Sequence, residues 1–161
     1  GWLKRNTPQN IVIGGAAGAI PPVVGWAAVT GSLDLPALYL FTIVFFWTPP
    51  HFWALALMIQ NDYERAGVPM LPVVMGEKRT VQNIFIYSLA LVALTLLFAA
   101  SDAVGLVYLA SAAALGAIFV ALAWKLKVDY SIRRAKHLYL FSLLYLALLF
   151  SVMLADGVYR F

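Results

Sequence analysis

The sequence has no cysteine, which excludes disulfide bonds and thiolate metal sites. It is also poor in charge, because Asp, Glu, Lys and Arg make up 11% of the residues. Soluble domains carry roughly 25% charged residues. The opening Gly-Trp-Leu-Lys-Arg lacks the short apolar core and the cleavage site of a signal peptide. We therefore expect neither a secreted disulfide-rich protein nor a soluble globular domain.

Apolar residues make up 63% of the 161 residues and gather in long uncharged runs. A helix needs about 20 apolar residues to cross the hydrocarbon core of a bilayer. The runs that qualify cover residues 11–30, 35–60, 83–100, 103–124 and 138–155. These runs predict an all-α, multi-pass transmembrane helix bundle with five spans, in a single domain over residues 1–161, and the lipid bilayer as its surroundings.

The Lys and Arg residues fall almost entirely on one side of these spans. Of the 11, only Arg160 lies on the other side. By the positive-inside rule, the start of the chain and a loop over residues 61–81 are cytoplasmic, and the C-terminus is outside. We expect the basic run at 125–136 to hold its loop against anionic lipid headgroups. A topology signal accounts for the net charge of +4, so we expect no nucleic-acid partner.

Two proline pairs interrupt the first two spans, Pro21-Pro22 and Pro49-Pro50. Each proline removes a backbone donor and clashes with the preceding turn. Broken backbone is tolerated in a membrane only where protein or a water-filled cavity satisfies it. The two pairs therefore predict helix breaks and a cavity lined by these spans.

The 61–81 loop combines anions and cations with helix breakers such as Gly67 and Gly76, so we do not expect one continuous helix. Carboxylates are ligands that Mg²⁺ prefers, and Lys or Arg binds phosphate oxygens. Asp62 is one such carboxylate, and the alternative for it is a solvated side chain at a helix end. We expect it near a helix C-terminus, where the helix dipole disfavours an anion and a bound cation would remove the conflict.

His51 precedes Asp62 by about three helical turns, so both share one face if the helix is continuous. His51 would then lie about 16 Å deeper in the bilayer. One interpretation is a neutral histidine hydrogen-bonded to a carbonyl that Pro49 or Pro50 leaves unpaired. The other is a ligand contact or a proton-handling group, because ionisable residues inside a membrane are candidate functional residues.

Four blocks, at 4–15, 18–26, 50–56 and 61–72, together resemble the protoheme IX farnesyltransferases, or heme O synthases. This family is a branch of the UbiA-type superfamily of intramembrane prenyltransferases. The resemblance implies a fold of nine spans, of which the five predicted here would be the fifth to the ninth. It also implies a bacterial cytoplasmic (inner) membrane location. It further implies two acidic motifs, after the second and the sixth span of the family, of which the second contains Asp62. On this basis we expect the chain to be the C-terminal part of a longer protein, and inactive without the first of these motifs.

The resemblance implies roles for several residues of the loop and its surroundings. Asp62 is the expected catalytic residue and Mg²⁺ ligand, with Glu64 as a second candidate ligand, because Ala66 stands where many superfamily members have another Asp. The expected substrate-binding residues are Asn10, His51, Asn61, Tyr63, Arg65, Met70, Lys78 and Arg79.

The implied reaction moves a farnesyl group from farnesyl diphosphate to a vinyl group of heme B, giving heme O, with Mg²⁺ assisting loss of the diphosphate. Heme A synthase or terminal oxidase assembly proteins are the candidate protein partners. Three alternatives stay open: a prenyltransferase for a quinone or another aromatic acceptor, a membrane transporter, and a structural membrane subunit. The last leaves the mixed-charge loop unexplained.

Overall fold

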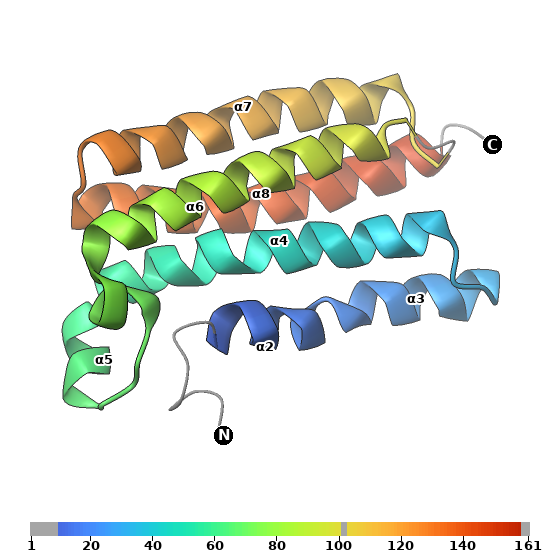
Figure 1. Cartoon of the computed structure of the whole chain (residues 1–161). Coiled ribbons are helices and arrows are strands. Elements are labelled where there is room, and N and C mark those ends of the chain that lie inside the picture. Colours follow the sequence, from blue (N-terminus) through green and yellow to red (C-terminus); the bar gives the residue numbers. More distant parts are fainter. Residues whose placement is uncertain (1–9, 101–102, 159–161) are drawn as a thin grey trace.

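The computed structural model describes residues 10–100 and 103–158, and helices and short connections make up these residues (Figure 1). Five candidate spans are long and apolar enough to cross a membrane. The all-α transmembrane bundle that the sequence predicts is therefore confirmed. The helices are α2 (Asn10–Gly18), α3 (Ile20–Thr30), α4 (Leu35–Met58), α5 (Gln60–Arg65), α6 (Leu71–Phe98), α7 (Leu106–Val128) and α8 (Ile132–Val158).

The first span consists of two helices. The chain breaks at the buried Ala19, and Pro21 and Pro22 follow in the first turn of α3, where a missing backbone donor costs little. Gly31 ends α3 in the left-handed conformation, with φ of 70°, and its N–H donates to the carbonyl of Ala27 at 2.9 Å. The break expected at the first proline pair is therefore present.

The second expected break is absent, because α4 continues through Pro49 and Pro50. Both prolines are buried, as are Thr48 before them and His51 after them. In the most apolar stretch of α4, 61% of the residues are buried, compared with 11% to 33% in the other spans. Packing on several sides therefore supports a helix that the prolines alone would weaken.

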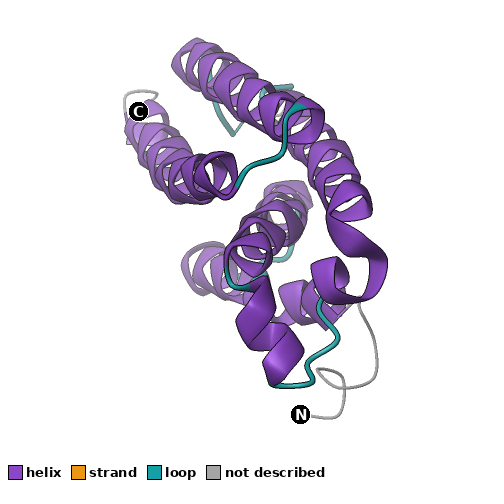
Figure 2. Ribbon diagram, turned by 90° about the vertical axis from the view of Figure 1, so that its left-hand side faces the viewer, coloured by secondary structure: helices purple, strands orange, loops and turns teal. Residues whose placement is uncertain are grey.

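Four helices form a closed ring in which α4 packs on α6 and α8, and α7 packs on α6 and α8 (Figure 2). Within the described residues, α2 and α3 touch each other and α4 alone among the long helices. The core of the ring includes the fully buried Tyr108 and Tyr145. Their hydroxyls reach Thr95, Tyr108 donating to its carbonyl at 3.1 Å and Tyr145 lying 3.2 Å from its Oγ1.

The segment expected as a loop over 61–81 is largely helical. It contains most of α5, a corner over residues 66–70 and the start of α6, which begins at Leu71 rather than near residue 83. Gly76 interrupts α6 with φ of 78° and ψ of 168°, so one continuous helix is indeed absent. The apolar run at 83–100 thus marks only part of α6, which begins twelve residues earlier and includes polar residues such as Glu77 and Lys78.

A contact between loop-side residues ties α6 to the turn between α7 and α8. The hydroxyl of Tyr130 faces the carboxylate of Glu77. Burial is the main cause that raises the pKa of Tyr130, and the interaction with the negatively charged Glu77 raises it further. Arg134 also pairs with Asp129 within this turn.

We predict that Tyr130→Phe lowers the stability of the protein by about 0.5–1.5 kcal/mol near neutral pH, because the interaction of the phenol with the Glu77 carboxylate is lost. A raised pKa means that the neutral phenol stabilises the fold below its ordinary pKa of about 10. This stabilisation disappears as the pH rises through the higher pKa of the folded state. The apparent melting temperatures of wild type and variant should therefore differ at pH 7 and converge in alkali.

Tyr87→Phe is the matched control, because the Tyr87 ring packs on Trp53 while its hydroxyl has no hydrogen bond among the described residues. If the melting temperatures of wild type and Tyr130→Phe differ by the same amount at pH 7 and at high pH, the proposed contribution of the Tyr130 hydroxyl is contradicted.

Candidate active site

A short polar corner follows α4 at one end of the bundle (Figure 1). α4 ends at Met58, and Ile59 leaves the helical conformation with φ of −118° and ψ of 32°. Asp62 therefore lies in the first turn of the separate helix α5, and the expectation of a helix C-terminus is wrong. At this end the helix dipole favours an anion. His51 and Asp62 also do not share one continuous helix face.

Backbone hydrogen bonds shape the corner that joins α5 to α6. The N–H of Val68 donates to the carbonyl of Tyr63 at 3.0 Å, and the N–H of Met70 donates to the carbonyl of Val68 at 2.8 Å. Gly67 has φ of 63°, a conformation that glycine adopts without steric cost. The side chain of Gln60 reaches the carbonyl of Pro72 at 3.5 Å. α5 is thus held against the start of α6.

The predicted site residues of the corner are mostly exposed and carry no ion pair. The exposed ones are Asn61, Asp62, Glu64, Arg65, Lys78 and Arg79. In the part of the chain that the structure describes, the single ion pair is the one between Arg134 and Asp129. The structure therefore brings these charges to one end of the bundle without neutralising them in pairs, so they remain available to a charged ligand.

Three predicted site residues differ from that exposed set. Tyr63 is half-buried, and Met70 is only 4% exposed, directly before α6. Packing in the protein interior is sufficient to explain a methionine at position 70. Contact of Met70 with a substrate stays a prediction. Asn10 is the first residue of α2, and its side chain lies outside the described part of the structure.

The carboxylates of the corner fit part of a magnesium site. No group of three His, Asp or Glu side chains that could hold a metal is found among residues 10–100 and 103–158. Mg²⁺ is usually held by one or two carboxylates together with substrate phosphates and water. Asp62, an exposed carboxylate on a short helix, suits that mode of binding, whereas Glu64 stands two positions further along the same helix and so points to another side of it.

His51 lies inside the bundle, 5% exposed, and seven residues, or about 10 Å, before the end of α4. Its ring stacks between Trp47, at 4.3 Å between centroids, and Tyr139 of α8, at 4.7 Å. Its Nδ1 lies 2.7 Å from Oγ of Ser142. The hydrogen-bond partner is therefore a hydroxyl of another helix, and the expected carbonyl released by Pro49 or Pro50 is not used.

The surroundings of His51 are what sequence reasoning missed. Tyr139 and Ser142 come from a span more than 80 residues away, and no spacing rule connects them with His51. A signal was present, because Ser142 is a polar residue in the apolar run 138–155. Polar residues in such runs often hydrogen-bond across helices.

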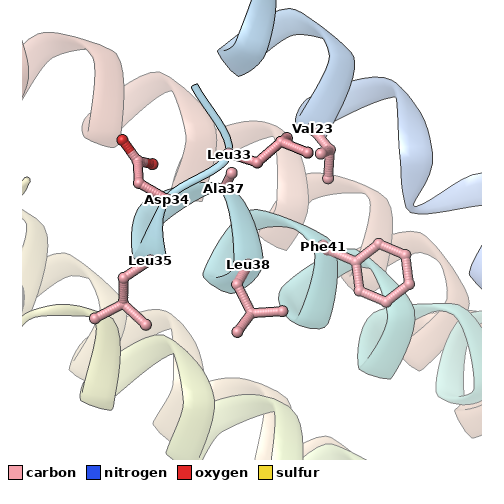
Figure 3. Close-up of a pocket in the computed structure, with 7 residues that line it drawn as sticks. All are labelled: Val23, Leu33, Asp34, Leu35, Ala37, Leu38 and Phe41. Carbon is pink, nitrogen blue, oxygen red and sulfur yellow. The ribbon is translucent and has the colours of Figure 1, made fainter. Parts of the chain in front are cut away.

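The first two spans line a hollow, as expected, but it lies away from both the polar corner and Pro49-Pro50. Figure 3 shows this hollow of about 640 Å³, at the end of the bundle opposite α5. Its lining residues are Val23, Leu33, Asp34, Leu35, Ala37, Leu38 and Phe41. Asp34 is the one charged side chain among them, so this apolar hollow offers little chemistry.

Comparison with known proteins gives matches along nearly the whole chain. The UbiA prenyltransferase family matches residues 1–155. A protein of Roseiflexus sp. (strain RS-1) named protoheme IX farnesyltransferase is 59% identical over 157 residues, covering 98% of this chain and 29% of the relative. A relative with the same name from Gloeobacter violaceus is 54% identical over 161 residues, covering 99% of this chain and 53% of the relative.

A third relative of that name, from Parvibaculum lavamentivorans, is 56% identical over 159 residues and is covered to 50%. The chain thus spans about half the length of these relatives, or less. No solved structure matches the chain. On the family match over residues 1–155 and on these identities, the chain belongs to the UbiA prenyltransferase family.

Proposed function

We propose that the protein transfers a farnesyl group from farnesyl diphosphate to a vinyl group of heme B, giving heme O. The names of relatives at 54–59% identity support this reaction. The observation within the structure that supports it best is the unpaired mixture of carboxylates and cations around α5. A diphosphate that carries a metal ion requires both kinds of charge.

In the proposed reaction, the bond between farnesyl C1 and the diphosphate oxygen breaks, and pyrophosphate leaves with the electron pair. The terminal carbon of the vinyl group donates its π electrons to C1, which forms the new carbon–carbon bond. Water adds to the remaining vinyl carbon and loses a proton, which gives the hydroxyl group of heme O. The products are heme O, pyrophosphate and one proton.

Asp62 is the proposed Mg²⁺ ligand on this chain, together with oxygens of the diphosphate, and Glu64 is a second candidate ligand. When bound, Mg²⁺ supplies stabilisation of the negative charge on the leaving pyrophosphate. Arg65, Lys78 and Arg79 are proposed to bind the other phosphate oxygens, for which guanidinium groups offer two parallel donors. All five of these side chains come from α5 and the start of α6.

The other half of the proposed reaction needs a dry interior, because an allylic cation reacts with water. Aromatic side chains of α4 and α6 pack together in the apolar interior of the bundle. Trp53 packs edge-on against Tyr87 at 5.3 Å, and Phe46 contacts the same ring at 5.7 Å. We propose that the isoprenoid chain lies in the membrane interior, with its diphosphate at the corner.

We predict that Asp62→Asn in the full-length protein lowers heme O formation by about 10²–10³-fold, as expected when one preorganised charge interaction with the reacting group is removed. Glu64→Gln should have a smaller effect. Product can be measured by chromatography of extracted hemes after incubation with heme B and farnesyl diphosphate.

Asp34→Asn is the control, because Asp34 is an exposed carboxylate at the opposite end of the bundle. Near-normal heme O formation by Asp62→Asn would refute the proposed role of Asp62. A full-length wild-type protein that forms no farnesylated heme would refute the proposed function itself.

We also propose that α5 faces the cytoplasm of a bacterial inner membrane. The chain has no cysteine, so single cysteines can report the topology. We predict that a membrane-impermeant maleimide labels Ser32→Cys, in the turn between α3 and α4, in intact spheroplasts. Ala66→Cys, at the polar corner, should be labelled only after lysis. The reverse pattern would place the corner outside and contradict the proposal.

A further inference from the structure

Ser142 of α8 makes two contacts with its single hydroxyl. Its Oγ lies 2.6 Å from the carbonyl oxygen of Tyr139 and 2.7 Å from Nδ1 of His51. A carbonyl oxygen can only accept, so the one hydroxyl proton belongs to the contact with Tyr139. The hydroxyl must then accept from His51, which makes the histidine the neutral tautomer with its proton on Nδ1. This assignment rests on the hydrogen-bond network.

The ring of His51 is also fixed in orientation. Trp47 and Tyr139 cover its two faces, with interplanar angles of 17° and 23°. The indole N–H of Trp47 donates to the backbone carbonyl of Ser142 at 2.8 Å. Ser142 therefore positions both the histidine and one of the rings that clamp it, and a rotation of the imidazole would break the contact at Nδ1.

The second ring nitrogen, Nε2, is left with a free lone pair. It makes no hydrogen bond within the described residues. Among the described residues, the fully buried side-chain nitrogens without a partner are the indole nitrogens of Trp26 and Trp53. Nε2 of His51 also lacks a partner but is not fully buried. Nε2 is therefore the ring nitrogen without a polar partner, on a side chain that is 5% exposed and that Phe52 also contacts in a T-shaped arrangement at 5.1 Å.

We propose that Ser142 is a positioning residue that presents Nε2 of His51 as an axial ligand to the iron of the heme substrate. A neutral imidazole nitrogen is a common iron ligand, and the hydrogen bond at the other nitrogen selects which one binds. The location of His51 about 10 Å inside the end of α4 suits a porphyrin in the membrane rather than a diphosphate at its surface. This inference rests on the proposed function.

The test is a titration of the purified full-length protein with ferric heme B, followed by absorption spectroscopy and by resonance Raman spectroscopy of the same complex after reduction to ferrous heme. Wild type should show histidine-ligated iron. His51→Ala should lose this signature and regain it when imidazole is added. Ser142→Ala should weaken the affinity for heme about 10–100-fold and broaden or shift the iron–histidine stretching band, as the loss of a hydrogen bond to a metal-ligating histidine typically does.

Ser88→Ala is the matched control. Ser88 is a fully buried serine of α6 whose hydroxyl donates only to the carbonyl of Ile84 in its own helix. This variant loses the same atom at the same burial but should bind heme with the wild-type affinity and spectrum. If Ser142→Ala and Ser88→Ala behave alike, Ser142 does not position His51.

The remaining outcomes separate this inference from the proposed function. An unchanged iron spectrum in His51→Ala, or a lost one that imidazole does not restore, would overturn the ligand assignment even if the enzyme forms heme O. Histidine-ligated heme in a wild-type protein that forms no farnesylated product would support the assignment while refuting the proposed function.

Discussion

Hydrocarbon provides no hydrogen-bond partners, so every polar group inside this bundle needs one within the protein. Most buried hydroxyls meet this requirement locally. Thr48 donates to the carbonyl of Val44 and Ser88 to that of Ile84, each one turn back in its own helix. These hydrogen bonds satisfy the hydroxyl groups without linking one helix to another. The contacts that do cross between helices are few, and they therefore determine where the interior is specific rather than merely apolar.

Two of these cross-helix contacts have different consequences. The hydroxyls of Tyr108 and Tyr145 converge on Thr95 and hold α6, α7 and α8 together in the core. The contact between His51 and Ser142 joins α4 to α8 and leaves Nε2 of the histidine without a hydrogen bond among the described residues. The first kind stabilises the ring of helices, whereas the second fixes the orientation of an ionisable side chain within it. The charged corner at α5 and the contact between His51 and Ser142 lie toward the same end of the bundle. This end therefore has a charged surface and, further inside, a polar side chain in a fixed orientation.

The sequence predicts the number of spans and the end at which the charges gather, because both depend on composition along short stretches. It does not predict that α6 begins at Leu71, since the charged residues at 77–79 interrupt any long apolar run there. It also wrongly places Asp62 at a helix C-terminus rather than in a first turn, because no glycine or proline marks the end of α4 at Ile59. The partnership of His51 with Ser142 depends on how α4 packs on α8, and no local pattern carries that information.

The attachment of the first span has a mechanical consequence. Since α2 and α3 rest on α4 and on no other long helix in the described residues, tilting that span away would open one interface only. The other four spans would keep all of their mutual contacts. Such a movement would expose one side of α4, the most buried helix, while the contacts among α4, α6, α7 and α8 remain in place.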